Sequence, residues 1–306
     1  MVTSSRHASV VVGAPLGDVH GDVVVGALRM QGIPVARLTA ELFRSGCVSW
    51  RPGSPVVFDD DGERWCVDDR TTVWWRRPGV AQPVELDEIE QRLVAKEIAV
   101  LLPGVLDAAG VRWVDAPWTL HRARLKPIQL AIAAQLGINV PLTLVTGDPV
   151  EAAAFAPDAA PLAKAASTGR GIAPHVAPVP TERLGLVETC PTTLQQRVDS
   201  SADVRVVTVG HRAFGWRRPR LGGGAVDWRA DDPSGSGFAA CGESEFPEAV
   251  AFAERLSLSF SVQDWLETAD GPVFLEVNPQ GQWLFLDEAD LILIPALVDH
   301  LRDGRA

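Results

Sequence analysis

Cysteine and histidine metal motifs are missing from this chain of 306 residues. The four cysteines are scattered and form no C-x-x-C, and the six histidines show no metal-ligand spacing. Scattered single cysteines are typical of free thiols in a reducing compartment rather than of a disulfide framework. We therefore expect a cytoplasmic protein whose metal ligands, if it has any, are oxygen atoms.

Long apolar runs and an excess of positive charge are missing as well. The longest apolar stretches, such as 291–298, fall short of the ~18 residues that a membrane span needs, and residues 1–13 lack the layout of a signal peptide. The net charge is −11 and the pI is near 5.0, which argues against a general nucleic-acid binder. The sequence predicts neither a membrane nor a nucleic acid as partner, and its length suggests about two domains.

The beginning of the chain predicts a parallel α/β arrangement. An apolar strand at 9–13, a helix at 18–31 and a second strand at 33–38 form a β-α-β unit. The turn between the first strand and the helix, Gly13 to Gly17, lacks both G-x-G-x-x-G and G-K-[ST]. This favours an ordinary tight turn over a phosphate loop.

Apolar periodicity and turn residues predict the remaining elements. A domain boundary is expected near residue 116, and residues 231–242 are expected to form a mobile loop. Further helices are predicted at 86–109 with a break at Pro103, at 120–135 with a restart at Pro127, and at 149–155, 246–256 and 288–301. Further strands are predicted at 72–75, 111–114, 140–145, 161–165, 193–198, 203–209, 212–216, 260–266 and 273–278.

The last two of these strands carry the most informative pattern. A hairpin centred near Asp270 would set Asp264 opposite Glu276 and Val262 opposite Asn278, with Phe274 on the face of Glu276 and Asn278. Opposed carboxylates about 5 Å apart repel unless a proton or a cation lies between them. Hard oxygen ligands favour magnesium, which takes its remaining ligands from water and phosphates. A solvated acidic face on an edge hairpin explains the same spacing, and the spacing alone does not decide between them.

Cationic residues elsewhere in the chain would suit a phosphate ligand. Lys126 precedes Pro127 at a predicted helix start, and Lys164 lies in an apolar strand, where a lysine is costly unless it meets an anion or snorkels to the edge. The run Ser167 to Gly171 follows Lys164, and its backbone N–H groups suit a phosphate tail. Arg205 and Arg229 add positive charge, yet the chain has no Walker loop and no kinase motif.

These motifs in this order resemble the ATP-grasp superfamily, and most closely the peptide-modifying ligases of the microviridin type, the graspetide synthetases. The resemblance extends from about Thr72 to Leu286. It is carried by the runs Val73–Pro78, Lys126–Leu130, Pro141–Thr146, Pro191–Val198, Asp203–Val206, Asp227–Arg229 and Phe274–Gln282.

The resemblance implies an ATP-grasp fold preceded by an N-terminal α/β domain. The implied domains are residues 1–115, a central lobe at 116–190, and a C-terminal lobe with the metal site at 191–306. Two lobes would clamp ATP and Mg²⁺. The implied nucleotide-binding residues are Lys126, Lys164, Ser167, Gly169, Gln195, Gln196, Arg197, Val198 and Asp203. The implied metal ligands are Asp264, Glu276 and Asn278, and the implied catalytic arginines are Arg205 and Arg229.

The family's chemistry joins Asp or Glu side chains of a ribosomal precursor peptide to Ser or Thr hydroxyls or Lys amines. A leader segment of that peptide docks to the enzyme, and the family also suggests a homodimer. Acidic residues of the peptide would meet an arginine cluster, for which the candidates are Arg76, Arg77, Arg217, Arg218 and Arg220. Two other functions remain open: a ligase that adds a free amino acid to a peptide or small molecule, and a non-catalytic ATP-binding regulator.

Overall fold

A parallel β-α-β unit opens the chain, as the sequence predicts. Asp18 begins α1 (Val19–Met30) by accepting a hydrogen bond from the Gly21 N–H, and Gly32, at φ +71°, follows its end. The structure is a computed structural model that describes residues 5–44, 48–60, 62–78, 86–155, 161–164, 176–220, 226–243 and 246–303. The first sheet has the order β3-β2-β7-β8, formed by β2 (Val10–Gly13), β3 (Val35–Leu38), β7 (Thr72–Trp75) and β8 (Arg112–Val114).

A second sheet and a long helix complete the N-terminal part. The sheet has the order β1-β6-β5-β4, formed by β1 (Arg6–His7), β4 (Val48–Ser49), β5 (Val56–Asp60) and β6 (Glu63–Val67). The helices are α2 (Ala40–Arg44) and α3 (Glu88–Ala108). The predicted break at Pro103 is wrong, because α3 continues through Pro103. Leu102, Pro103 and Leu106 are all buried, so tertiary packing outweighs the hydrogen bond that proline removes.

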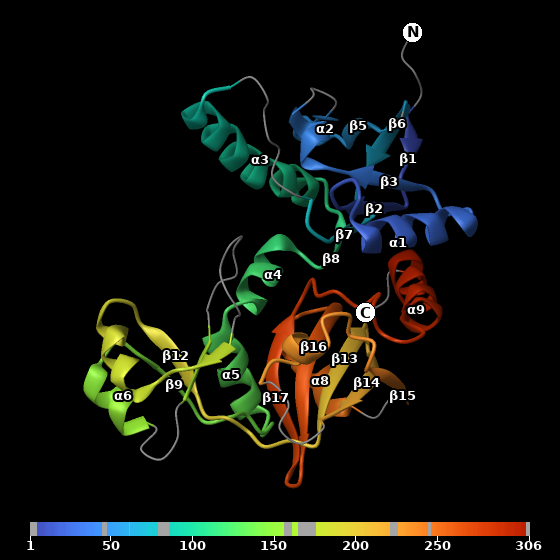
Figure 1. The fold of residues 1–306 in the computed structure, drawn as a ribbon. Coiled ribbons are helices and arrows are strands. Elements are labelled where there is room, and N and C mark those ends of the chain that lie inside the picture. Colours follow the sequence, from blue (N-terminus) through green and yellow to red (C-terminus); the bar gives the residue numbers. More distant parts are fainter. Residues whose placement is uncertain are drawn as a thin grey trace.

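A small antiparallel lobe lies to one side of the molecule (Figure 1). Its sheet has the order β11-β10-β12-β9, formed by β9 (Thr143–Thr146), β10 (Leu162–Lys164), β11 (Val176–Pro178) and β12 (Thr192–Gln195). Two helices, α6 (Pro149–Phe155) and η1 (Thr181–Glu188), pack together there. The strand predicted at 193–198 therefore ends early, at Gln195.

A five-stranded antiparallel sheet forms the C-terminal part, in the order β15-β14-β13-β16-β17. Its strands are β13 (Ala202–Val209), β14 (Arg212–Pro219), β15 (Ala239–Glu243), β16 (Phe260–Thr268) and β17 (Gly271–Asn278). The surrounding helices are α4 (Pro117–Ala123), α5 (Lys126–Gln135), α7 (Trp228–Asp231), α8 (Pro247–Arg255) and α9 (Ala289–Asp303). The loop predicted at 231–242 is wrong in part, since β15 begins at Ala239.

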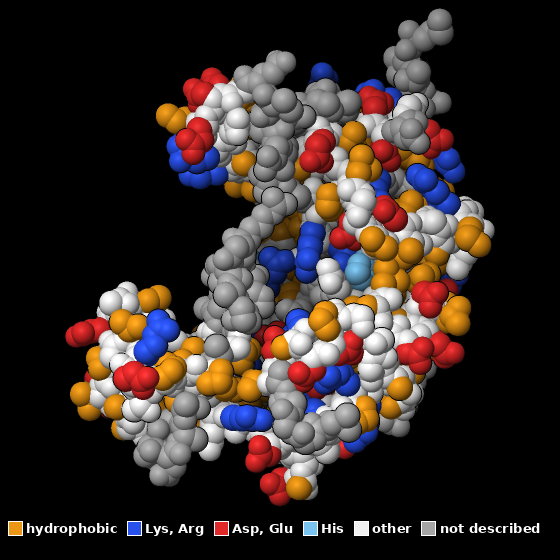
Figure 2. Space-filling view, viewed as in Figure 1, with side chains coloured by type: hydrophobic (Ala, Val, Ile, Leu, Met, Phe, Trp, Pro, Cys, Tyr) orange, Lys and Arg blue, Asp and Glu red, His pale blue; other side chains and the backbone are white. Residues whose placement is uncertain are grey.

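The two ends of the chain meet in one core. In Figure 1, α9 lies beside α1, and buried side chains of both helices belong to a cluster that includes β2 and the C-terminal sheet. A second cluster joins α4, α5 and α8 to the other side of that sheet. Figure 2 shows the surface hollowed between the N-terminal part and the two lobes below it. No helix in the described ranges is long and apolar enough to cross a membrane.

Candidate active site

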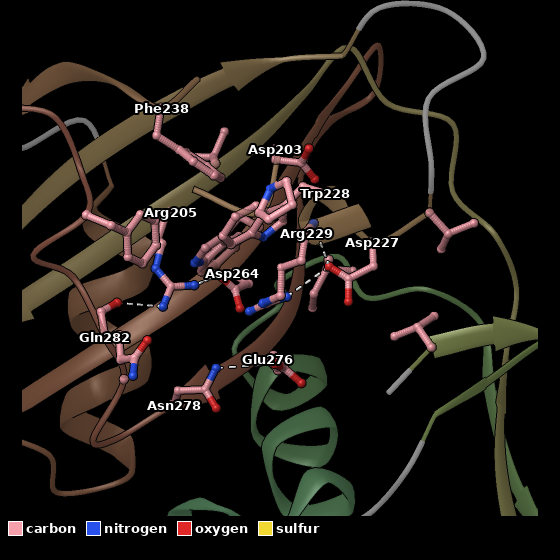
Figure 3. Close-up of a pocket in the computed structure, with 18 of the residues that line it drawn as sticks. Asp203, Arg205, Asp227, Trp228, Arg229, Phe238, Asp264, Glu276, Asn278 and Gln282 are labelled. Carbon is pink, nitrogen blue, oxygen red and sulfur yellow. Dashed lines mark hydrogen bonds and ion pairs between the residues drawn. The ribbon is translucent and has the colours of Figure 1, made fainter. Parts of the chain in front are cut away.

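A cavity of about 590 Å³ lies over one side of the C-terminal sheet. It brings together polar side chains from β10, β13, α5, α7, β16 and β17 (Figure 3). Ten of the candidate residues from the sequence line it: Arg77, Lys126, Lys164, Asp203, Arg205, Arg220, Arg229, Asp264, Glu276 and Asn278. Residues separated by up to two hundred positions therefore share one site.

The hairpin of β16 and β17 places the carboxylates as the sequence predicts. Asp264 pairs with Glu276, and Val262 pairs with Asn278. The strands pair as far as Thr268 and Gly271 at the turn, and the register shifts between Asp264 and Trp265. This bulge leaves Leu275 without a partner, so the alternation of side chains is broken there.

The bulge corrects one prediction about the faces of β17. Phe274 does not share a face with Glu276, because it is fully buried in the core with Val277 and Trp265. Leu275 and Glu276 both line the cavity instead. The extra residue thus lets Glu276 face the cavity while Phe274 and Val277 both remain in the core.

Two cations neutralise the carboxylates. The Lys126 Nζ donates to Glu276 Oε2, and Arg205 Nη1 donates to Asp264 Oδ1 at 2.6 Å. Arg205 Nη2 also donates to the Gln282 carbonyl at 2.7 Å. Both Arg205 and Asp264 are largely shielded from solvent, with side-chain exposures of 4% and 14%. Burial of this kind strengthens each charge–charge interaction.

The pKa values of Asp264 and Glu276 are shifted in opposite directions. Burial raises the pKa of Asp264; the Arg205 charge opposes this shift, and the Glu276 charge adds to it. Burial also raises the pKa of Glu276, but the ion pair with Lys126 and the charge of Lys164 outweigh it and hold that pKa below its usual value. Glu276 is therefore ionised, and Asp264 is the carboxyl that a further cation would help to ionise.

Two more cations approach from other elements. Lys164 reaches the cavity from the small lobe; burial lowers its pKa, while the charge of Glu276 opposes that shift and the charge of Lys126 adds to it. Arg229 donates to Asp227 Oδ1 at 3.0 Å, and its guanidinium lies 4.6 Å from the centre of the Trp228 ring. Both cations line the same cavity as Asp264 and Glu276, and Figure 3 shows Arg229 beside Asp264.

The oxygen atoms at the cavity fit a magnesium ion. Asp264 and Glu276 supply carboxylates, and Asn278 Nδ2 donates to Glu276 Oε1 at 3.2 Å, which leaves the amide oxygen of Asn278 available. No cluster of three or more His, Cys, Asp or Glu suited to a metal occurs in the part of the chain that the structure describes. Two carboxylates and one amide oxygen match the preference of Mg²⁺, which leaves coordination positions for water and phosphate.

Several candidate residues lie elsewhere. Arg76 is 1% exposed and donates to Asp18 and to the carbonyls of Gln280 and Gly281, so it corrects the prediction of a peptide-binding arginine. Arg217 pairs with Glu267, and Arg218 pairs with Asp203. Neither of these two arginines lines the cavity.

The predicted hinge residues also fall outside the cavity lining. Gln195 is 3% exposed and donates to Thr143 Oγ1 at 2.9 Å, whereas Gln196 and Arg197 are exposed and Val198 is half-buried, beyond the end of β12. Asp203 lines the cavity, but its oxygens accept hydrogen bonds from Arg218 and Arg220. Ser167 and Gly169 lie outside the described residues.

Sequence reasoning missed the residues that hold the segment after β17. His20 Nε2 accepts the Trp283 N–H at 3.0 Å, and Gln280 Nε2 donates to the Trp75 carbonyl at 2.7 Å. Burial and the Arg76 charge lower the pKa of His20 to about 4, so this ring stays neutral and accepts. Trp228 lies within the predicted run Asp227–Arg229, but its packing with Phe238 and Phe285 along one side of the cavity was not predicted. No local pattern marks these residues, because their partners are distant in the sequence.

Comparison with protein-family models gave no match, and comparison with curated proteins gave none either. Solved structures do match over almost the whole chain. The macrocyclase MdnC of Microcystis aeruginosa MRC, bound with the precursor peptide MdnA, is 21% identical with a TM-score of 0.81, covering 97% of this chain and 99% of that one. A RiPP-associated ATP-grasp ligase of Chryseobacterium gregarium, in complex with ADP and a leader and core peptide, is 20% identical with a TM-score of 0.83, covering 99% and 98%.

A third similar structure is the ATP-grasp ligase PsnB complexed with a precursor variant, Mg and ADP. It is 21% identical with a TM-score of 0.74, and the match covers 97% of this chain and 98% of that one. Coverage of 97% or more in both directions means that the N-terminal part is matched as well as the two lobes. The predicted fold class is confirmed: this chain has the ATP-grasp fold of these ligases.

Proposed function

We propose that this protein is an ATP-dependent ligase that joins side chains within a peptide. It activates Asp or Glu carboxylates as acyl phosphates and links them to Ser or Thr hydroxyls or to Lys amines. The observation that carries the proposal is the opposed Asp264 and Glu276 with Lys126, Lys164 and Arg205 around one cavity. The names of the similar structures support it, since they include a macrocyclase, precursor peptides, Mg and ADP.

The chain's own residues would bind and orient the nucleotide. Lys126 and Lys164 come from the two sides of the cavity and would hold phosphate oxygens. On nucleotide binding, Lys126 would exchange its ion pair with Glu276 for a phosphate, which frees the carboxylate. Asp264, Glu276 and Asn278 would hold Mg²⁺, which supplies neutralisation of phosphate charge when bound.

Arginines would act on the charge that develops during transfer. A carboxylate is a poor electrophile, and its acyl phosphate carries a good leaving group. Arg205 is fixed by Asp264 and the Gln282 carbonyl, and Arg229 is fixed by Asp227. Guanidinium groups held in this way need little reorganisation when the γ-phosphoryl group moves to the substrate carboxylate. They would also stabilise the acyl phosphate while a hydroxyl or amine attacks its carbonyl carbon.

The intact mass of a candidate precursor peptide tests the proposal. The peptide is incubated with the protein, ATP and Mg²⁺, and ADP release is followed in parallel. Loss of one water for each link, with ADP release, is the expected result. A gain in mass equal to an added amino acid would instead support a ligase for free amino acids. Nucleotide binding without any turnover would support a regulator.

A matched pair of variants tests the metal ligands. Glu276→Gln removes a carboxylate from the cavity, whereas Glu267→Gln removes one that pairs with Arg217 outside the cavity. Glu276→Gln should lower the rate of ADP release by about 10²–10³-fold, and Glu267→Gln should leave it within about threefold. Unchanged release by Glu276→Gln protein would refute the metal site.

The domain boundaries at 115 and 190, a homodimer, a cytoplasmic location and the absence of a nucleic-acid partner belong to the same proposal. The negative net charge supports the last of these. Size-exclusion chromatography with light scattering would measure the oligomeric state directly.

A further inference from the structure

The outward face of α4 combines an aromatic side chain with positive charge. The inward residues Leu120 and Ala123 are buried in the core shared with α5 and α8. On the other side, Trp118, His121 and Arg122 are exposed at spacings of three and four residues, which places them on one helix face. Trp118 is 52% exposed, although a side chain of this size is normally well covered.

Trp118 is held in place by a row of tryptophans. Its ring meets Trp113 edge to face at 5.7 Å between centroids, and Trp113 meets Trp75 in the same way at 5.7 Å. The indole N–H of Trp113 donates to Asp107 Oδ1 at 3.0 Å. A half-exposed aromatic ring that is already ordered loses little conformational entropy on binding, which is typical of an anchor for a partner.

Positive charge continues from α4 to the cavity. Arg122 and His121 form no ion pair within the described ranges, and Arg124 is exposed and donates to Gln280 Oε1. Arg77 donates to the carbonyl of the same glutamine at 2.7 Å and lines the cavity. We name Trp118, His121 and Arg122 the α4 strip; it carries positive charge in a protein whose net charge is −11.

The α4 strip lies where an extended chain can approach the site. Figure 1 shows α4 between the N-terminal part and the small lobe, and Figure 2 shows the surface hollowed between these parts with Lys and Arg side chains inside the hollow. Helix α4 leads directly to Lys126 at the start of α5. A ligand bound along the strip would therefore continue over Arg77 into the cavity.

We infer that the α4 strip docks an acidic segment of the peptide substrate, with an apolar residue against Trp118 and a carboxylate on Arg122. The inference rests on the proposed function, because the cavity at the end of the strip is where carboxylates of the segment would react. Opposite charge both attracts the segment and fixes its direction towards the cavity. The strip would thus select peptides in which acidic residues flank one apolar residue.

Fluorescence anisotropy with two labelled synthetic peptides tests the inference without turnover. One peptide alternates Glu with Ser around a single Phe, and the other has Gln in place of every Glu. Wild-type protein should bind the first peptide at least about tenfold more tightly, and this preference should shrink as salt is raised. Equal affinity for both peptides, or no measurable binding of either, would overturn the inference.

Two variants locate the binding surface. Trp118→Ala and Arg122→Glu should each weaken binding of the acidic peptide about tenfold. Arg255→Glu changes an exposed arginine in the last turn of α8 by the same charge and should leave binding unchanged. Full binding by both strip variants, or an equal loss in Arg255→Glu, would place the peptide elsewhere.

A kinetic readout separates docking from chemistry. With a precursor peptide that loses water, the strip variants should raise KM for the peptide about tenfold while kcat and KM for ATP stay unchanged. A fall in kcat without a change in KM would contradict docking. If no peptide loses water but the acidic peptide still binds the strip, the proposed ligase function fails and the docking surface stands.

Discussion

Asp115 is a buried carboxyl group that forms no ion pair among the residues that the structure describes. Its oxygens accept the backbone N–H groups of Ser259 and Phe260 at 2.7 and 3.2 Å. Burial raises the pKa of Asp115 to about 6, although these hydrogen bonds oppose the shift. The folded state therefore binds a proton more tightly than the unfolded state, whose pKa is 3.8. This contribution makes stability fall as pH rises from about 4 to about 6.

Asp115→Asn removes the titrating carboxyl group, so the stability of the variant relative to wild type should increase as the pH rises. The difference in free energy of unfolding between variant and wild type should change by about 2 kcal/mol in favour of the variant between about pH 4.5 and pH 7. Urea unfolding at the two pH values measures it. The comparison must be made between the two proteins, because His20 acts in the opposite direction: its lowered pKa costs stability as pH falls from 6.5 towards 4. A difference that is independent of pH would contradict the assignment to Asp115.

Three arginines bind the segment that follows β17. Arg76 donates to Asp18 at 2.9 Å and to two carbonyls of the segment, Arg77 donates to one, and Arg205 donates to the Gln282 carbonyl. Asp18 also begins α1, so Arg76 links the first helix to the segment that follows β17. The arginines predicted to bind peptide therefore include one whose role is structural.

Arg76 and Arg77 form a matched pair for testing that role. Arg76→Ala should lower the free energy of unfolding by roughly 3–5 kcal/mol, because it removes the cation paired with half-buried Asp18 and takes a donor from the Gly281 carbonyl. Arg77→Ala should cost about 1 kcal/mol or less, since Arg77 is exposed and makes one bond to the segment. Urea unfolding compares them, and Arg76→Lys keeps the charge if the alanine variant does not fold. Equal losses at the two positions would contradict a structural role for Arg76.

Gly281 lets the same segment pass close to β16. A Cβ at this position would lie 2.6 Å from Val262 Cβ, and Val262 pairs with Asn278. Gly281→Ala should therefore destabilise the protein by about 1–3 kcal/mol and weaken Mg²⁺-dependent nucleotide binding, because the clash pushes on β16, the strand that carries the proposed metal ligand Asp264. Gly26→Ala is the control: it lies within α1 with no atom nearby and should stabilise by about 0.5–1 kcal/mol. Calorimetry of folding and of nucleotide binding measures both, and unchanged nucleotide affinity in Gly281→Ala would disconnect this contact from the site.

Local sequence patterns predicted most elements because capping, periodicity and turn chemistry act over a few residues. The pairing of Asp264 with Glu276 followed from the hairpin turn and alternation. The bulge at Leu275 did not follow, because it depends on the fit of Phe274 and Val277 into a core supplied by α5 and α8. The ends of β12 and the path of α3 through Pro103 were likewise set by packing partners distant in the chain.

At the scale of the whole molecule, the residues of the site come from separate lobes. The sequence does not predict how these lobes lie relative to one another. The chain has three lysines, Lys96, Lys126 and Lys164. Lys126 comes from α5 and Lys164 from the small lobe, and both line the cavity. Family resemblance named these two, but the residues that hold the lobes together were not predicted. One such contact is the bond from the Phe274 N–H to the Asn139 carbonyl at 2.8 Å.

Lys164 should lower the stability of the free protein and raise the stability of the nucleotide-bound protein. It forms no ion pair among the residues that the structure describes, and burial lowers its pKa, so Lys164→Met should leave the free protein equally or more stable. Wild type should gain about 2.7 kcal/mol from a non-hydrolysable ATP analogue with Mg²⁺ at a hundred times its Kd. The variant should lose at least half of that gain, because a phosphate loses its cation from the small lobe.

Lys96→Met, on the exposed side of α3, should match wild type in both states. Thermal unfolding with and without the analogue measures all three proteins. Loss of a nucleotide-binding lysine should leave the free protein equally or more stable and should reduce the stability gained from the analogue. Loss of a lysine with a structural role would lower the stability in both states. Equal stabilisation of Lys164→Met and wild type by the analogue would mean that the small lobe does not close on the phosphates, and the two-lobed cavity would not be the nucleotide site.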